Sequence, residues 1–394
     1  MRWFGRKGSS RAGRDAARPF LFRGWSAAPP VGEWPRSYEA QVREAYLGNA
    51  VAQRSVRLVA ESVAWAPLVA EDAVGGGAGG GAARALKLAA PALLDAAASH
   101  LLLHGNAYLQ LLPDAEGAPA ELFALRPERV SVEPGPGGWP AAYVYKAGEA
   151  KTRLAARDGL GRPALVHVRA MHPLDDHYGL GSLGAAAGAV AIHNAATKWN
   201  KALLDNAARP SGALVMSGEE GVLADEQFER LKAELEAEFA GAGNAGRPML
   251  LEGGMTWQAM SMTPADMDFV GLKAAAAREI ALAFGVPPML LGLPGDATYA
   301  NYREANRALW RLTVLPLADR ILGAVGSALA AWWPGLKLRL DIDQVTALAE
   351  DRERLWAQVT AADFLSREEK RAMLGIPGRA GLGGDSGSAG EGGE

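Results

Sequence analysis

Two long alanine-rich segments constrain the fold more than any other feature of the sequence. The first, residues 183–208, is followed by Arg209-Pro210, and the second, residues 264–285, is followed by Pro287-Pro288. Proline lacks a backbone N–H and clashes with a preceding helical turn, so both segments are expected to be helices that end at these sites. Their small side chains allow close approach between helix backbones, so the helices can pack against copies of themselves.

The residues before these helices combine helical and strand patterns, which indicates an α+β fold. Apolar spacing predicts a helix at 38–64, ended by Pro67, and a second at 90–104, closed by Gly105-Asn106 as a left-handed cap. The glycine-rich stretch 75–81 is expected to be a flexible loop between strands. Further strands are expected at 107–112, 122–125, 130–133, 142–146 and 165–169.

The segment between the two long helices, residues 211–262, is expected to be a compact acidic module. It contains a strand pattern at 213–216, an amphipathic helix pattern with Phe228, Leu231 and Leu235 on one face, and two further strand patterns. Four basic and nine acidic side chains lie between residues 209 and 262. The module is therefore a poor candidate for gripping nucleic acid by its phosphates.

The C-terminal third is expected to be mainly helical. A helix at 301–332 should be kinked at Pro316, and a strand at 336–342 should precede a charged helix at 345–362. Ser366 and Glu369 have the spacing of a capping box that opens a last short helix. The Gly-, Ser- and acid-rich residues 378–394 are expected to be disordered.

Charge is distributed unevenly along the 394 residues. The net charge is −3, yet the first 24 residues carry +6, which leaves −9 for the remainder. The basic, proline-rich arm 1–35 indicates a segment that binds an acidic surface, or alternatively a solubilising tail. The chain has no cysteine, and the stretch 96–113, which lacks Asp, Glu, Lys and Arg, is too polar to span a membrane.

Two local patterns resemble functional sites but fit other roles better. Residues 179–184 match G-x-G-x-x-G, but the preceding strand ends near Arg169, too early for a dinucleotide site, so the glycines are interpreted as easing entry into a packed helix. His172, Asp175, Asp176 and His177 lack the spacing of a helical metal site and are interpreted as polar loop residues. No Walker lysine and no G-x-S-x-G elbow is present. We therefore expect no catalytic residue, cofactor or metal.

Several short motifs follow one another along the chain. They are His104-Gly-Asn-Ala-Tyr108, Leu125-Arg-Pro-Glu-Arg-Val130, Asn206-Ala-Ala-Arg-Pro-Ser-Gly212, Leu250-Leu-Glu-Gly-Gly-Met255, Met260-Ser-Met262, Ile280-Ala-Leu-Ala-Phe-Gly-Val-Pro-Pro288, Leu290-Leu-Gly292 and Ala297-Thr-Tyr-Ala-Asn301. In their order and spacing they resemble the portal proteins of long-tailed phages, including the portals of phage-derived gene transfer agents. The resemblance extends from about Tyr38 to Pro377.

The resemblance implies a division of the chain into the parts of a portal subunit. It implies an α/β wing at 36–182 and 301–344, with stem helices at 183–208 and 264–285. It also implies a small α/β clip at 209–263, a tunnel loop at 286–300 and a short helical crown at 345–377.

The resemblance also implies which residues take part in each function. The tunnel loop would present to DNA the residues Gly292, Pro294, Asp296, Thr298, Tyr299 and Asn301. The stem would carry Lys198, Lys201, Lys273 and Arg278. The clip would dock partner proteins through Glu229, Glu234 and Glu236.

By the same resemblance, the chain would form a ring, with twelve subunits expected, at one capsid vertex of a phage-like particle assembled in the bacterial cytoplasm. Double-stranded DNA would pass through the ring without sequence readout. The partners would be a terminase motor, a head–tail adaptor and the major capsid protein, with no membrane involved. The alternative is an oligomeric α+β scaffold protein unrelated to DNA passage.

Overall fold

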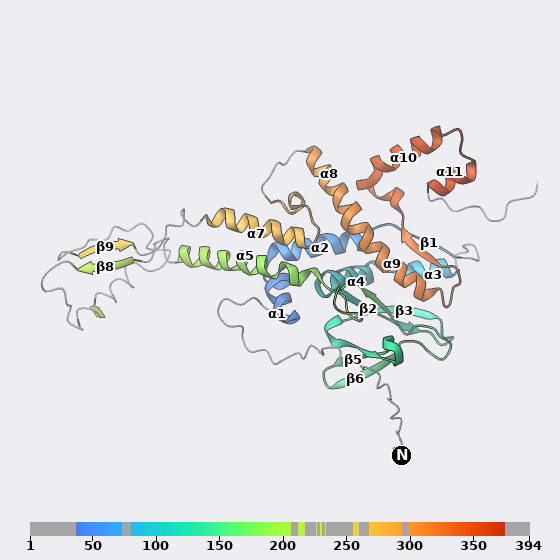
Figure 1. Cartoon of the computed structure of the whole chain (residues 1–394), viewed down its shortest axis with the longest axis horizontal. Helices are drawn as coiled ribbons and strands as arrows, with labels where there is room; N and C mark the ends of the chain where they lie inside the picture. The colour runs from blue at the N-terminus through green and yellow to red at the C-terminus, as the bar shows by residue number, and fades with distance from the viewer. Residues whose placement is uncertain are drawn as a thin grey trace, which may run out of the picture.

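The computed structural model describes residues 37–72, 80–205, 212–216, 226, 229, 230, 233, 255–259, 268–293 and 299–374. Two long helices, α5 (Ser182–Asp205) and α7 (Phe269–Ala283), extend side by side away from a body of helices and small sheets (Figure 1). The strands β8 (Gly212–Met216) and β9 (Met255–Ala259) form a separate antiparallel pair. The predicted α+β class is therefore confirmed.

The predicted helix at 38–64 is divided into successive helical pieces. Helix α1 (Tyr38–Val42) continues into a π-helical turn (Arg43–Leu47), and α2 (Ala50–Ala64) starts anew. Asn49 causes the restart, because its backbone is extended and its side-chain oxygen accepts hydrogen bonds from the N–H groups of Val51 and Ala52, both at 3.0 Å.

Strand β1 (Leu68–Glu71) precedes the glycine-rich stretch, but the expected strand after that stretch is wrong. Residues 73–79 lie outside the described residues, and α3 (Gly81–Leu88) follows them. Ala82, Ala85 and Leu88 are buried at helical spacing, and this periodicity outweighs the loop-like composition before it. Helix α4 (Pro91–His104) ends at Gly105, whose φ of 81° confirms the predicted left-handed cap.

Two three-stranded antiparallel sheets follow α4. One has the order β3 (Pro119–Leu125), β2 (Asn106–Pro113), β7 (Leu165–Arg169). The other has the order β4 (Val130–Pro134), β5 (Pro140–Ala147), β6 (Ala150–Ala155), and β6 was not predicted. A small apolar cluster joins the two sheets through Tyr108, Leu125, Val130, Tyr143 and Leu165.

The predicted kink near Pro316 takes the form of a π-helical turn. Helix α8 (Tyr299–Leu309) passes through this turn (Trp310–Val314) into α9 (Leu315–Leu329). The missing N–H of proline disturbs the hydrogen bonds of the turn before it, which is where the π-helix lies. The run 300–329 is long and apolar enough to span a membrane by composition, but α9 buries Ala318, Ile321 and Val325 in the body of the protein.

The C-terminal segment returns to the start of the chain and then forms two short helices. Strand β10 (Lys337–Leu340) pairs antiparallel with β1, and α10 (Ala349–Ala361) follows two 3-10 turns at 342–344 and 346–348. The charged helix thus begins four residues later than predicted. The capping box of α11 (Arg367–Met373) is confirmed, because the N–H of Glu369 donates to Ser366 Oγ at 3.2 Å and the N–H of Ser366 donates to Glu369 Oε2 at 2.8 Å.

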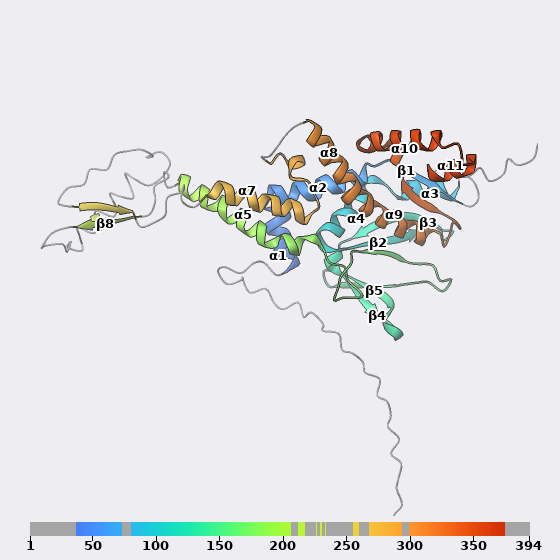
Figure 2. The ribbon, with the colours of Figure 1, turned by 45° about the horizontal axis from the view of Figure 1, so that its top comes forward.

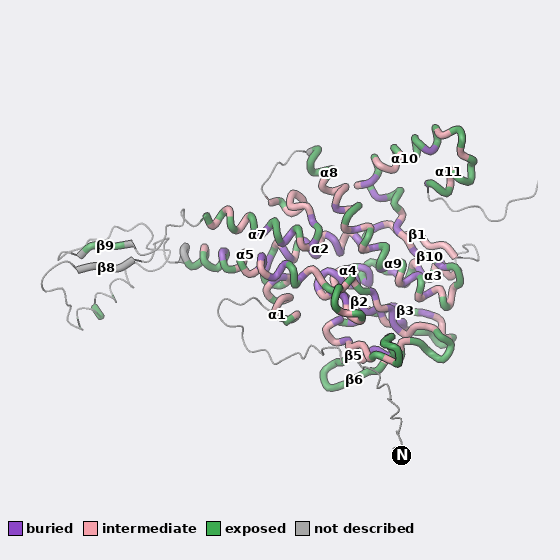
Figure 3. The backbone as a smooth tube through the Cα atoms, in the orientation of Figure 1, coloured by how far each residue is buried: buried purple, intermediate pink, exposed green. Residues whose placement is uncertain are grey.

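The main core lies where α2, α4, α9 and the inner ends of α5 and α7 meet. Its most enclosed side chains include Val56, Leu94, Leu183, Ile280 and Ile321, each no more than 1% exposed. Buried residues thin out along α5 and α7 away from the body, and α10 and α11 are largely exposed (Figure 3). The core therefore anchors the two long helices at one end only.

Candidate functional site

Among the described residues, helices α5 and α7 project together from the body of the protein (Figures 1 and 2). The predicted helix at 183–208 corresponds to α5, with residues 206–210 outside the described part of the chain. The predicted helix at 264–285 begins instead at Phe269, where the Asp268 side chain accepts a hydrogen bond from the N–H of Gly271 at 3.1 Å. Both expected long helices therefore exist, and they lie against each other.

The middle of α5 is fastened to the N-terminal helices by side-chain amides. Asn49 donates to Asn194 Oδ1 at 2.8 Å, and Asn194 donates to the backbone oxygen of Glu44 at 2.9 Å. A third contact of 3.1 Å joins Asn49 to His193 Nδ1. Burial, and then the charge of Lys273 on α7, lower the pKa of His193. The neutral form of His193 is therefore favoured at this closely packed junction between α2, α5 and α7.

The inner end of α7 is fastened to the π-helical turn before α9. Gly285 ends the helix with a φ of 66°, as predicted from its position before Pro287. The hydroxyl of Thr313 donates to the Gly285 carbonyl at 2.7 Å. This bond satisfies a carbonyl that the end of the helix would leave without a partner.

The outer ends of α5 and α7 have apolar side chains that the subunit itself leaves exposed. Trp199 of α5 and Phe269 of α7 stack with ring centroids 5.8 Å apart, which joins the two helices there. Trp199 is nevertheless 48% exposed, and Val270 and Leu272 of α7 are 84% and 45% exposed. Large apolar side chains so exposed on one projecting feature favour contact with another protein surface.

The basic residues predicted for the stem lie on these two helices. Lys198 and Lys201 are exposed on α5, and Arg278 is exposed on α7. Lys273 is half-buried between the helices, close enough to His193 to affect its titration. The four residues do not form one cluster: Lys273 faces the α5–α7 junction, whereas the other three are open to solvent.

The residues predicted for the tunnel loop lie at the edges of the described chain. A 3-10 turn (Pro288–Leu291) ends at exposed Gly292, which has a φ of 72°. Pro294, Asp296 and Thr298 lie outside the described residues. Tyr299 is the first residue of α8, and Asn301 is exposed in its first turn.

The predicted acidic module is described only in part. Strand β8 confirms the strand predicted at 213–216, and β9 accounts for one of the two further strands. Glu229 is an exposed helical residue, whereas Glu234 and Glu236 lie outside the described residues, as do Phe228, Leu231 and Leu235. In Figure 1 the β8–β9 pair lies beyond the outer ends of α5 and α7.

The glycines of G-x-G-x-x-G serve close packing. A Cβ on Gly181 would lie 2.6 Å from the carbonyl oxygen of Leu103, and one on Gly179 would collide with the carbonyl oxygen of Gly105. The neighbouring polar residues stabilise the loop before α5. Asp175 Oδ1 accepts from the N–H groups of His177 and Tyr178, and His172 Nδ1 accepts from the N–H of Leu174. These residues thus have structural roles in this loop.

A buried polar cluster beside these glycines was missed by the sequence reasoning. Asn106 is fully buried, and its side-chain oxygen accepts from the N–H of Gly179 at 2.7 Å and from His167 Nε2 at 3.1 Å. His167 also stacks on Tyr108, with ring centroids 4.3 Å apart. Burial is the main cause that lowers the pKa of His167 to about 3. The motif His104-Gly-Asn-Ala-Tyr108 could have indicated this cluster, because a buried Asn after a left-handed glycine can form hydrogen bonds to two other segments.

The combination of an α+β body, a projecting helix pair and a small strand pair at its tip defines a portal-type subunit. A family model described as phage portal protein matches residues 50–375. The chain belongs to this family of structural proteins, which confirms the family and the role as a portal protein predicted from the sequence motifs.

Relatives and solved structures agree with this membership. A protein from Rickettsia bellii is 43% identical over 286 residues, covering 71% of this chain and 72% of the relative. The probable portal protein of Streptomyces phage phiC31 is 24% identical over 53% of this chain and 46% of its own length. A chain in the virion of a native gene transfer agent particle is 48% identical, with a TM-score of 0.66 over 89% of this chain and 96% of that one.

Another solved structure has the same fold at much lower identity. It is an HK97-family phage portal protein from Corynebacterium diphtheriae, 17% identical, with a TM-score of 0.52 over 76% of this chain and 94% of its own. The fold thus persists where most side chains differ.

Proposed function

We propose that this chain forms a ring at one vertex of a phage-like particle and that DNA enters and leaves through the channel of that ring. The observation that carries the proposal is the match to the neck of a gene transfer agent particle computed with C12 symmetry. That chain is 48% identical, and the match covers 89% of this chain and 96% of that one. Such extensive identity favours the same assembly, a ring of twelve copies in a virion, over an unrelated oligomeric scaffold.

The exposed apolar ends of α5 and α7 support a ring. A ring needs an interface in which one surface of each subunit binds a different surface of the next and the rotation closes. Trp199, Val270 and Leu272 are exposed in the single subunit and can be covered by the neighbouring copy. The core holds only the inner ends of both helices, so subunit contacts would stabilise the outer ends.

The channel would conduct DNA without holding it. No Lys or Arg lies between Gly292 and Asn301, the segment proposed as the tunnel loop, so each subunit offers DNA polar groups without added positive charge. Binding to DNA phosphates by Lys and Arg is strong and salt-dependent, which would oppose movement. Weak contacts repeated round the ring would retain DNA without reading its sequence. This role requires no catalytic residue and no cofactor.

The acidic module at the tip would dock the other proteins of the packaging pathway. Glu229 is exposed, and with Glu234 and Glu236 it gives the module an acidic sequence suited to a basic partner surface. The partners would be the terminase motor during packaging and the head–tail adaptor afterwards, while the major capsid protein surrounds the ring. Reversing the three glutamates to lysine should leave rings intact but weaken capture of motor or adaptor proteins. Unchanged capture would show that the docking surface lies elsewhere.

Deleting residues 295–298 tests the proposed channel role most directly. Particles produced with this deletion should contain rings but lose or fail to retain DNA, measured as nuclease-protected DNA per particle. A matched control deletes four residues from the glycine-rich stretch 75–81, residues 75–78, and should package normally. Normal DNA retention by the 295–298 deletion would contradict the assignment of this loop.

A further inference from the structure

The C-terminal helices α10 and α11 have few apolar contacts with the rest of the chain. Only Val359 is buried in α10, and α11 buries no residue. The segment is anchored just before α10 by Val345 and Leu348, both 3% exposed. Beyond this anchor, apolar packing alone does little to fix the position of α10 relative to the body.

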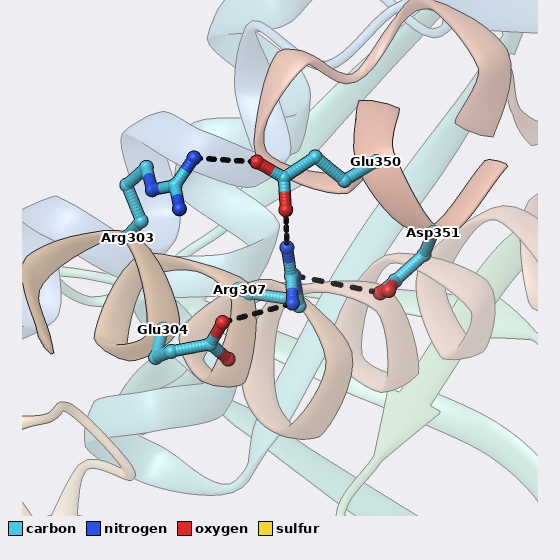
Figure 4. Close-up of polar contacts among 5 residues, drawn as sticks. All are labelled: Arg303, Glu304, Arg307, Glu350 and Asp351. Atoms are coloured by element: carbon cyan, nitrogen blue, oxygen red, sulfur yellow. Dashed lines mark hydrogen bonds and ion pairs between the residues drawn. The ribbon is translucent and has the colours of Figure 1, made fainter. Parts of the chain in front are cut away.

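A cluster of five charged side chains joins α10 to α8 (Figure 4). Glu350 receives one arginine on each carboxylate oxygen: Arg303 Nη1 lies 2.5 Å from Oε1, and Arg307 Nη2 lies 2.5 Å from Oε2. Arg307 also lies 3.0 Å from Glu304 and 3.6 Å from Asp351. Ion pairs thus join α8 and α10, which are 40 residues apart in the sequence.

The surroundings of Arg307 distinguish this cluster from an ordinary surface ion pair. The Arg307 side chain is only 13% exposed, whereas Arg303 and Glu350 are 49% and 47% exposed. Exposed pairs contribute little because water and salt screen them, and a network around one enclosed arginine is less screened. The Nε of Arg307 is buried and has no hydrogen-bond partner among the described residues, since Asp351 is too far away for a hydrogen bond. Removing Glu350 would leave Arg307 short of acceptors.

Helix α8 depends on this contact as much as α10 does. Its first turn and a half, residues 300–304, is exposed, and Leu309 at its end is the first buried side chain. Neither helix is held in place by a core of its own along the contact. We propose that the cluster of Arg303, Glu304, Arg307, Glu350 and Asp351 is a latch that makes α8 and α10–α11 one moving unit. A displacement of α8 is then passed to the C-terminal helices, and the reverse also holds. The latch does not rest on the proposed role in DNA passage.

Hydrogen exchange measured by mass spectrometry on the full-length protein tests the latch. Glu350→Gln should raise amide exchange rates by about three- to tenfold in both α8 and α10, with α9 unchanged. Glu353→Gln is the matched control, because Glu353 is exposed on the same helix and the charge change is the same. Faster exchange confined to α10, or no change in either helix, would overturn the proposal.

A second variant separates coupling from independent loosening of each helix. In a latch, Arg307→Gln should produce the same change in both helices, and the double variant should add little to either single variant. Raising the salt concentration should speed exchange of α8 and α10 in the natural protein more than in Glu350→Gln. Additive effects of the two substitutions, or equal salt sensitivity in both proteins, would show that the helices are not coupled by these charges.

Discussion

The two ends of helix α7 have similar apolar side chains but different surroundings. Ile280, near the inner end, is fully buried among α2, α9 and their neighbours, whereas Val270, near the outer end, is 84% exposed. Helix α5 shows the same contrast between Leu183, 1% exposed, and Trp199, 48% exposed. The comparison teaches that apolar content alone does not say where the core lies. At the inner ends the core-facing apolar side chains are buried by this chain, whereas apolar side chains at the outer ends remain available to another chain.

The largest expected effect comes from shortening an inner side chain. Ile280→Ala should destabilise the folded subunit by about 2–5 kcal/mol, because it leaves a cavity in the main core. Val270→Ala on the same helix should change subunit stability by no more than about 0.5 kcal/mol. Chemical denaturation of the two full-length variants measures both values. Equal losses would mean that the outer end is as well packed as the inner end.

The second effect is a dependence of stability on pH that originates in the body. The pKa of His167 is lowered to about 3 in the folded protein, so the unfolded chain binds a proton at a higher pH than the folded one. The contribution of neutral His167 to the free energy of unfolding is fully present above about pH 6.5. It is lost as the pH falls toward 3, by up to about 1.4 kcal/mol per pH unit.

His167→Gln isolates this contribution, since glutamine does not titrate but can still donate to Asn106. Between pH 6.5 and 5 the variant should lose stability less steeply than the natural protein. Burial also lowers the pKa of His100, which is unchanged in both proteins and contributes equally to each. Parallel stability curves would indicate that His167 is not held neutral.

The smallest effect compares two glycines at the inner end of α5. Gly181→Ala places a Cβ 2.6 Å from the carbonyl oxygen of Leu103 and should cost about 1–3 kcal/mol. Gly184→Ala meets no atom within 4 Å and should stabilise the helix by up to about 1 kcal/mol. Thermal unfolding should therefore shift in opposite directions. Shifts in the same direction would contradict the close approach of the two segments.

Local signals accounted for much of the fold. The cap at Gly105, the capping box at Ser366 and the helix end at Gly285 depend on a few neighbouring residues, so the sequence was sufficient to predict them. Strand β6 was missed because nearly all its residues are exposed and no alternation marks it. Helix α3 was predicted as a strand because the glycine-rich stretch before it is typical of a loop between strands. The helical spacing of Ala82, Ala85 and Leu88 was the stronger signal.

Contacts between distant segments could not be predicted in the same way. Arg307 and Glu350 are 43 residues apart, and Asn106 and Gly179 are 73 apart. Nothing in the neighbourhood of either residue specifies its partner, because the fold brings the pair together. The family resemblance supplied the order of the segments, whereas these contacts came only from the structure.

Electron microscopy of the purified full-length protein tests the central claim most directly. The exposed outer ends of α5 and α7 should be covered by neighbouring copies in a closed ring, and the match to a neck computed with C12 symmetry favours twelve copies. The account predicts rings of twelve subunits with a central channel wide enough for duplex DNA. Monomers only, or oligomers without such a channel, would contradict it.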